Sequence, residues 1–277
     1  MTLAEAEDFR AESASLHDLL AGAAVAVWAE PTDFKGWTPY DVLGHLHMFN
    51  QAAAATLEGE DAFGQFTSGF RQAAERGTSG VAYTREWLGE ISGAELLSRW
   101  RAYADGLADL YRDIDPRRRV PWGRGPGMSA RSCISARQME TWAHGQAVFD
   151  LLGVERQDAD RIRNIAVIGI NTYAWSFRNR GLDVPEEKPF VALTAPSGAL
   201  WTWNDPVAAS RVEGPAVEFC QVVAQTRNVA DTDLVIEGVS ARDWMSFAQC
   251  FAGPPHDPPP PGLRRRRDEG YTVLQSS

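Results

Sequence analysis

Two histidines and a glutamate in this chain have the residue types of a divalent-metal site: His45, Glu140 and His144. Glu140 and His144 are four positions apart, so on a helix their side chains project from one face and can share an ion. His45 lies far upstream and must come from a different element. Two imidazoles and one carboxylate leave coordination positions open, which is typical of a catalytic metal site rather than a closed structural one.

A second histidine, His47, competes with His45 for the inward-facing position. The two point about 200° apart on a helix, so both cannot face one cavity. The buried side of this helix is expected at Val42, Leu46, Phe49 and Ala53. His45 falls within that arc, and His47 is expected nearer the outside. A lone histidine on such a face is more commonly a hydrogen-bonded core residue. The presence of Glu140 and His144 on another helix favours the interpretation of His45 as a metal ligand.

Glu140 and His144 also have a plainer interpretation as a surface pair worth a few tenths of a kcal/mol. The helix that carries them, however, is apolar on most sides, at Ile134, Met139 and Phe149 among others. A carboxylate buried there without a partner would cost several kcal/mol. A metal ion would supply the partner, and Arg131 or Arg137 could serve instead.

The first 150 residues have the pattern of a helical bundle. Helices are expected at about 3–28, 39–57, 66–75 and 92–114, and another contains Glu140 and His144. Thr38-Pro39 is a helix start signal, Ser92 and Glu95 have capping-box spacing, and Ser129 or Ser132 caps the last helix. Four long helices with these connections predict an up-and-down four-helix bundle, in which metal sites form between facing helices.

The sequence after Gly153 changes to an α+β pattern. Residues 158–180 suit a helix, and two β-rich runs separated by Pro196-Ser-Gly198 predict a hairpin. A helix opening near Pro215, a strand at 234–239 and a helix at 241–251 complete a small domain. The predicted fold class is therefore α+β, with a bundle at 1–153, a small α+β domain at 154–255 and a Pro/Arg-rich tail at 256–277 expected to be disordered.

Composition excludes several functional classes. With 277 residues, 44% hydrophobic residues and ten tryptophans, the chain is expected to be globular. A net charge of −10 argues against nucleic-acid binding, and the basic run 264–267 is followed at once by Asp268 and Glu269. The acidic N-terminus is unlike a signal peptide, and no stretch has the length and apolarity of a membrane helix.

The three cysteines, Cys133, Cys220 and Cys250, are scattered and lack C-x-x-C spacing, which predicts a reducing, cytoplasmic location. Cys133 begins the helix of Glu140 and could approach the ion, but a buried, inert thiol is the favoured interpretation.

Two segments carry a resemblance to a known family. The segment GWTPYDVLGHL, which ends just after His45, and RQMETWAHGQ, which contains Glu140 and His144, resemble the two metal motifs of the DinB-like metal-binding superfamily. Within it the chain is similar to the actinobacterial branch of the mycothiol-dependent maleylpyruvate isomerase type. The segments APSGALWTW, VVAQTRN and FAQCFAGPP resemble that branch's second domain, so the resemblance covers about residues 5–255.

The resemblance implies a four-helix bundle that holds a divalent metal, usually zinc, through His45, Glu140 and His144. It also implies mycothiol as thiol cofactor or co-substrate, and an arginine from the second domain, matched here by Arg227. Zinc would hold the thiol as its reactive thiolate, and Arg227 would pair with a substrate carboxylate or an oxyanion.

Three functional hypotheses follow. The first is a mycothiol-dependent isomerase or S-transferase that acts on a small electrophilic substrate, such as a natural-product intermediate. The second is a metal-dependent hydrolase or lyase that activates water without a thiol. The third is a non-catalytic ligand-binding module. A small-molecule substrate is the expected partner, without nucleic acid or membrane, and the substrate, the metal and a homodimeric state stay open.

Overall fold

The computed structural model describes residues 2–123 and 127–265 and divides into two compact units, the first ending at Leu152 and the second beginning at Gly153. The chain has the predicted α+β class: a helical N-terminal region is followed by a small mixed sheet with helices.

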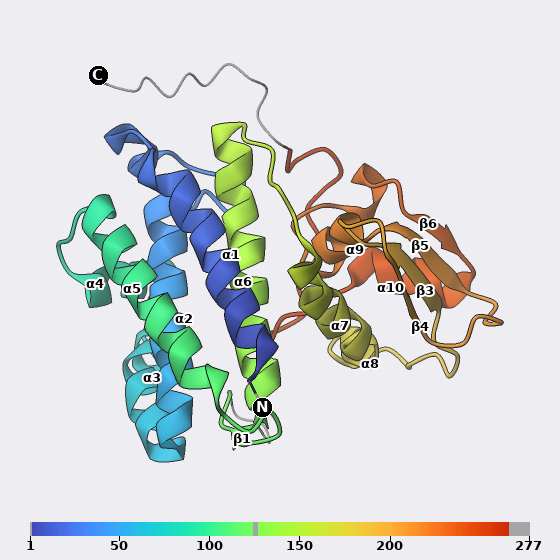
Figure 1. Cartoon of the computed structure of the whole chain (residues 1–277), viewed down its shortest axis with the longest axis horizontal. Helices are drawn as coiled ribbons and strands as arrows, with labels where there is room; N and C mark the ends of the chain where they lie inside the picture. The colour runs from blue at the N-terminus through green and yellow to red at the C-terminus, as the bar shows by residue number, and fades with distance from the viewer. Residues whose placement is uncertain (1, 124–126, 266–277) are drawn as a thin grey trace. The chain divides into compact units, whose positions relative to one another are not determined.

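Four long helices form the first unit and lie side by side (Figure 1). They are α1 (Ala4–Ala21), α2 (Pro39–Glu58), α5 (Gly93–Arg112) and α6 (Ala130–Leu152). α1 packs against α5 and α6, and α2 packs against the same two helices from the other side. The short helix η1 (Val25–Ala29) joins α1 to α2, and a two-stranded ribbon of β1 (Arg119–Val120) and β2 (Met128–Ser129) joins α5 to α6.

The direction of the helices does not alternate throughout the bundle. The ring of His47 on α2 contacts Tyr103 on α5, and about two turns further along both helices Thr56 hydrogen-bonds to Tyr111. α2 and α5 are therefore parallel, and the strict up-and-down order expected from the sequence is wrong at this step. The reason is the connection, in which α3 (Glu60–Glu75) and α4 (Gly80–Leu88) carry the chain back to the starting end of the bundle.

The expected single helical piece at 66–75 is also too short. α3 starts six residues earlier, at Glu60, and α4 was not predicted. Glycines at positions 64, 69, 77 and 80 lower the helical signal of this segment. Phe63, Phe66 and Phe70 nevertheless repeat at helical spacing and give α3 an apolar face.

Helix starts follow the sequence signals. The Thr38 side chain accepts a hydrogen bond from the Asp41 backbone N–H, and Asp41 accepts one from the Thr38 backbone N–H, so the capping box is complete with Pro39 at the first position. Ser92 caps α5 through the Glu95 N–H. Ser129 accepts a hydrogen bond from the Ser132 N–H, so Ser129 is the capping residue of α6.

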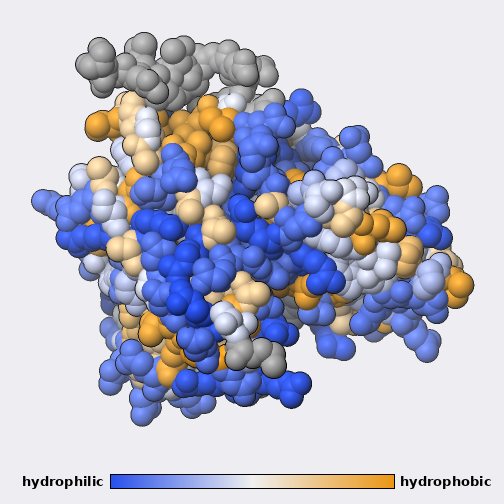
Figure 2. Space-filling model, in the orientation of Figure 1, coloured by the Kyte–Doolittle hydropathy of each residue, from blue (hydrophilic) through white to orange (hydrophobic). Residues whose placement is uncertain are grey.

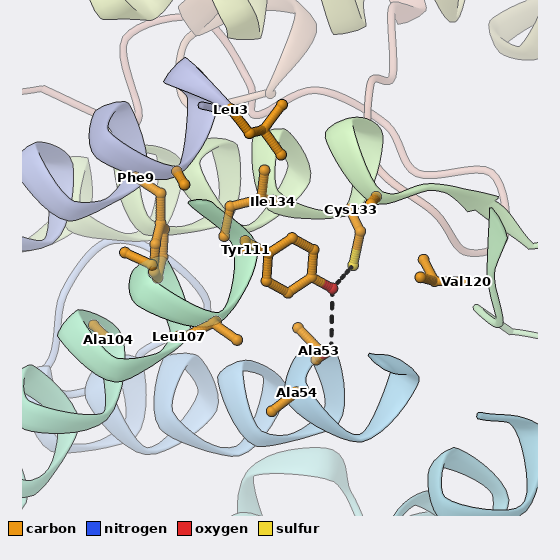
Figure 3. Packing of buried hydrophobic residues seen from close by; sticks show 13 residues of the cluster. Leu3, Phe9, Ala53, Ala54, Ala104, Leu107, Tyr111, Val120, Cys133 and Ile134 are labelled. Carbon is orange, nitrogen blue, oxygen red and sulfur yellow. Dashed lines mark hydrogen bonds between the residues drawn. The ribbon is translucent and has the colours of Figure 1, made fainter. Parts of the chain in front are cut away.

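A buried apolar cluster holds α1, α2, α5 and α6 together at one end of the bundle (Figure 3). Tyr111 is at its centre, and its hydroxyl faces the Cys133 sulfur at 3.1 Å and the Ala53 carbonyl oxygen at 3.1 Å. Burial raises the pKa of the Cys133 thiol, so this cysteine is neutral at physiological pH. Its surroundings agree with the predicted buried, inert thiol.

The second unit contains a four-stranded sheet in the order β4-β3-β5-β6. Its strands are β3 (Phe190–Thr194), β4 (Leu200–Trp203), β5 (Arg211–Pro215) and β6 (Val235–Glu237). β3 pairs antiparallel with β4 and parallel with β5, and β5 pairs antiparallel with β6. The hairpin predicted at Pro196-Ser-Gly198 is confirmed, with the Gly198 N–H donating to the Ala195 carbonyl and Gly198 at φ +85°.

The helices of the second unit precede, separate and follow the strands of this sheet along the chain. They are η2 (Asp160–Ile162), α7 (Arg163–Asn171), α8 (Tyr173–Arg178), α9 (Ala216–Val223), η3 (Val229–Asp231) and α10 (Val239–Phe247). The single helix expected at 158–180 is interrupted at Thr172. The Thr172 hydroxyl donates to the Ile168 carbonyl, a type of bond that bends helices.

The expectation of a disordered tail at 256–277 is wrong for residues 256–265. Residues 256–265 bind back onto the second unit, whereas 266–277 lie outside the described residues. Gln225 donates to the His256 carbonyl, Asn228 donates to the Pro259 carbonyl, and Asp231 accepts from the Gly262 N–H. A proline-rich composition favours disorder, but the carbonyl oxygens of proline residues remain available as hydrogen-bond acceptors.

Among the described residues, no helix is both long and apolar enough to cross a bilayer. The face seen in Figure 2 is mostly hydrophilic, with smaller apolar areas between the polar ones.

Candidate metal centre

The three residues singled out in the sequence meet where α2 and α6 pack against each other. His45 lies in the second turn of α2, and Glu140 and His144 lie one turn apart in the middle of α6. Among the described residues they form the one group of three or more histidine, cysteine, aspartate or glutamate side chains close enough to hold a metal ion. One donor atom from each residue lies within 4.8 Å of the other two.

A single oxygen of Glu140 faces both imidazoles. Its Oε2 atom is 3.3 Å from Nε2 of His45 and 3.1 Å from Nε2 of His144. Two ligands of a tetrahedral zinc ion are about 3.3 Å apart, given metal–ligand distances of about 2.0–2.1 Å. The Glu140 oxygen thus already lies at a separation from each imidazole nitrogen that suits one shared cation. Nitrogen and oxygen ligands of this kind suit zinc among the divalent metals.

Electrostatics keep the donor atoms in the forms that bind metals. Burial lowers the pKa of His45 from 6.5 to about 4, so this imidazole is neutral at physiological pH. Burial by itself would raise the pKa of Glu140, but hydrogen bonds to His144 and His45 hold it well below its usual value. The site therefore combines a carboxylate with a neutral imidazole, as metal coordination requires.

An arginine on α6 keeps the two helices in register. Arg137 is fully buried, and its Nε donates to Oδ1 of Asn50 at 3.0 Å while a terminal nitrogen reaches the Leu46 carbonyl. Burial lowers the pKa of Arg137, and the nearby Glu140 carboxylate opposes this effect. Arg137 thus faces α2 one turn before Glu140. The other arginine considered from the sequence, Arg131, pairs with Glu5 at the start of α1 instead.

Aromatic rings enclose the three donor residues. Trp37 stacks on His144, with ring centroids 5.4 Å apart and an angle of 7° between the planes. Phe34 meets the edge of the same imidazole at 5.0 Å, and Phe49 lies 4.6 Å from His45. Only 13–23% of each donor side chain is exposed. These rings limit the access of water and hold the imidazoles in their orientations.

Phe34 was missed by the sequence analysis, since it lies in the loop before α2 and has no spacing that links it to the histidines. The Thr32 side chain accepts a hydrogen bond from the Phe34 N–H and donates to the Trp37 carbonyl, so this loop is closed on itself next to the site. A turn of this kind leaves only a weak signal in sequence.

The expectation that His47 faces outward was wrong. Only 7% of His47 is exposed, and its ring contacts Trp87 and Tyr103 on the side of α2 away from the metal centre. Burial lowers its pKa to about 4. α2 is covered on both faces, because α4 and α5 lie opposite α6. The apolar arc read from the sequence marked only one of these faces.

Arg227 lies in the second unit, between α9 and η3, where it donates a hydrogen bond to the Thr226 carbonyl. The metal centre lies in the first unit, so the proposed role of Arg227 at the metal remains a prediction.

Comparison with known proteins assigns this architecture to a family of enzymes. Residues 9–149 match the model of the mycothiol maleylpyruvate isomerase N-terminal domain. An uncharacterised protein of Mycobacterium tuberculosis, found in two strains, is 38% identical over 248 residues, which span 90% of this chain and 95% of that protein. The chain therefore belongs to the family of the mycothiol maleylpyruvate isomerase N-terminal domain.

Solved structures show the same fold. The crystal structure of the mycothiol-dependent maleylpyruvate isomerase matches with a TM-score of 0.52 at 14% identity, over 81% of this chain and 90% of that one. A histidine-to-alanine mutant of that enzyme matches with a TM-score of 0.51 at 15% identity over the same shares. At this identity the likeness concerns the fold, and the activity of this chain is a separate question.

Proposed function

We propose that this protein is a zinc-dependent thiol enzyme that uses mycothiol as cofactor or co-substrate and catalyses isomerisation or S-transfer on a small electrophile. The observation that carries the proposal is the convergence of His45, Glu140 and His144 on one point between α2 and α6. Membership of the family supports the use of mycothiol. A cytoplasmic location and a small-molecule substrate, without nucleic acid or membrane, belong to the same proposal.

The residues present fit a zinc ion. Two imidazole nitrogens and one carboxylate oxygen are ligands that zinc accepts, and three protein ligands leave room for a substrate group. Bound zinc would supply positive charge that stabilises a thiolate at neutral pH. His45 and His144 would each donate a ring nitrogen, and Glu140 would donate one carboxylate oxygen.

Other residues of the site would shape the reaction without binding the ion. Trp37 and Phe34 would fix the ring of His144 by stacking and edge contact, and Phe49 would shield His45. Arg137 would hold α2 against α6, so that His45 stays opposite Glu140. Arg227 would pair with an anionic group of the substrate, as the resemblance of its segment to the family implies.

Metal content tests the site directly. The purified protein is expected to hold about one zinc ion per chain, and His45→Ala and His144→Ala should each lower this to less than about a tenth. His17→Ala is the matched control, because His17 lies on α1 beside Asp18 and outside the centre. Zinc retained at full occupancy in the double variant His45→Ala/His144→Ala would refute the site.

Thiol dependence tests the reaction class. The protein is expected to turn over Michael acceptors and conjugated cis-alkenes when both mycothiol and zinc are present. Mycothiol without zinc, or zinc without mycothiol, should give no turnover. Glu140→Gln should lower this turnover at least about 100-fold. Turnover that persists without any thiol would instead support a hydrolase or lyase. Zinc binding without turnover of any substrate would support the non-catalytic ligand-binding module.

A further inference from the structure

A cavity of about 760 Å³ lies at the end of the bundle where α2 finishes, and the metal centre does not account for it. Its walls come from α2, α3 and the β1–β2 ribbon, all within the first unit. The volume lies within the range of small-molecule binding sites, about 300–1,000 Å³.

The cavity and the metal centre share one face of α2. Phe49, Ala52, Thr56 and Gly59 line the cavity and repeat at helical spacing, and His45 lies one turn before Phe49 in the same series. Phe49 belongs to both sites, since its ring is 4.6 Å from that of His45 while it also forms part of the cavity wall. The cavity therefore begins one turn from the metal ligands and extends about 15 Å along α2, at 1.5 Å per residue.

The opposite wall is a mixed apolar and polar face of α3. Phe63, Gly64, Thr67 and Arg71 line it at helical spacing. The ring of Phe63 stacks with Trp122 from the connection after β1, with centroids 5.8 Å apart and planes at 29°. Flat aromatic surfaces of this kind favour a planar, apolar molecule.

The charge of the cavity is positive, although the whole chain has a net charge of −10. Among the described residues, three arginines, Arg71, Arg118 and Arg119, line it against one carboxylate, Glu60. Arg71 donates to the Gly64 carbonyl and Arg118 to the Leu57 carbonyl, and among the described residues neither forms an ion pair with a carboxylate. A guanidinium has five N–H donors, so one carbonyl acceptor leaves most of them for an anion.

We infer that this cavity binds an organic anion with a planar, apolar body, whose charged end lies among Arg71, Arg118 and Arg119 and whose body extends along Phe63 and Trp122 toward Phe49. Its role as the substrate site rests on the proposed function, because that role requires a metal centre one turn away. Binding of the anion itself requires only the cavity.

Calorimetric titration of the full-length protein with 2-naphthoate tests the inference, with the uncharged 2-naphthamide as comparison. Naphthoate is expected to bind at least about tenfold more tightly than the amide, since only the carboxylate can pair with the guanidinium groups. Arg71→Gln and Arg118→Gln should each weaken naphthoate binding about three- to tenfold and leave amide binding unchanged. Trp122→Leu should weaken both.

Arg76→Gln is the matched control, because Arg76 follows the end of the same helix α3 but does not line the cavity. It should keep the wild-type affinity for both compounds. Equal affinity for naphthoate and its amide, or equal weakening by Arg76→Gln and Arg71→Gln, would overturn the inference. So would the absence of naphthoate binding at millimolar concentration.

The two proposals fail in different experiments. Naphthoate binding to the chelated wild type and to His144→Ala reports on the cavity alone, whereas zinc content reports on the metal centre alone. Normal naphthoate binding by a protein that never holds zinc would support anion binding in the cavity and refute the proposed zinc-dependent activity. Thiol-dependent turnover by a protein that binds naphthoate and its amide equally well would refute anion binding in the cavity and leave the proposed enzymatic function intact.

Discussion

The imidazoles of His45, His144 and His47 differ in what they contact. His45 and His144 share the Glu140 oxygen. His47, two residues after His45, lies among aromatic rings, and Gln51 is within hydrogen-bonding distance of its Nε2. Its Nδ1 atom is buried and has no hydrogen-bond partner within the part of the chain that the structure describes. A buried imidazole of this kind is neutral in the folded protein, and protonating it favours unfolding.

This environment predicts a pH dependence of stability. The pKa of His47 is about 4 in the folded chain and about 6.5 when unfolded, so its contribution is present above pH 6.5 and is lost as pH falls toward 4. When the pH falls from 7 to 5, this loss should lower the free energy of unfolding by about 2 kcal/mol. His47→Phe should therefore lose about 2 kcal/mol less than wild type over this interval, as measured by urea unfolding at the two pH values.

His17→Gln serves as the control for that measurement, since His17 is partly exposed on α1. It should lose as much stability as wild type between pH 7 and pH 5. If His47→Phe also behaves like wild type, His47 does not have the lowered pKa that its burial implies.

At the scale of elements, the contact between α2 and α6 determines whether the donor atoms meet. Asn50 and Arg137 form a buried bridge between these helices, close to the turn that carries Glu140. Among the described residues, Asn50→Leu would leave the Leu46 carbonyl, at 3.4 Å, as the hydrogen-bond acceptor on α2 for the guanidinium. Because an under-compensated buried charge is costly, the variant should lose about 3 kcal/mol in its free energy of unfolding.

Zinc affinity should report the same change. In Asn50→Leu the register of α2 against α6 is less constrained, so affinity measured against a chelator should fall about 10–100-fold, as for other outer-shell changes. Thr38→Ala removes a cap from the same helix and should cost only about 1 kcal/mol. If Thr38→Ala lowers zinc affinity as much as Asn50→Leu, general stability rather than register controls the site.

At the scale of the whole molecule, residues 256–265 belong to the folded second unit. Gln225 has a left-handed backbone, with φ +54°, and its side chain bonds to the Ala248 carbonyl and to the carbonyl and ring of His256. Arg264 donates to the Gln225 carbonyl, so this segment closes over the loop after α9. The loop that contains Arg227 is thus held by residues far along the chain.

Truncation tests this closure. A chain ending at Gly253 should unfold at a temperature at least about 4 °C lower than a chain ending at Arg265, because several buried hydrogen bonds are lost, each worth about 1 kcal/mol. The difference between the two truncated chains isolates residues 254–265. Equal melting temperatures in scanning calorimetry would show that this segment does not stabilise the second unit.

Local signals in the sequence determined the α+β class, the long helices, their caps at Thr38 and Ser92, and the hairpin at Gly198. Each depends on residues only a few positions apart, whose preferences act on the backbone directly. The spacing of Glu140 and His144, with the motif around His45, pointed to the group that the structure brings together.

Only the tertiary structure decided how these elements are used. That α2 runs parallel to α5, that His47 is buried against Tyr103, and that residues 256–265 fold back onto Gln225 all depend on contacts between residues distant in sequence. The same is true of the aromatic shell of Trp37 and Phe34. Burial of a side chain is the sum of what every neighbouring element covers, and periodicity along a single helix reports only one of those neighbours.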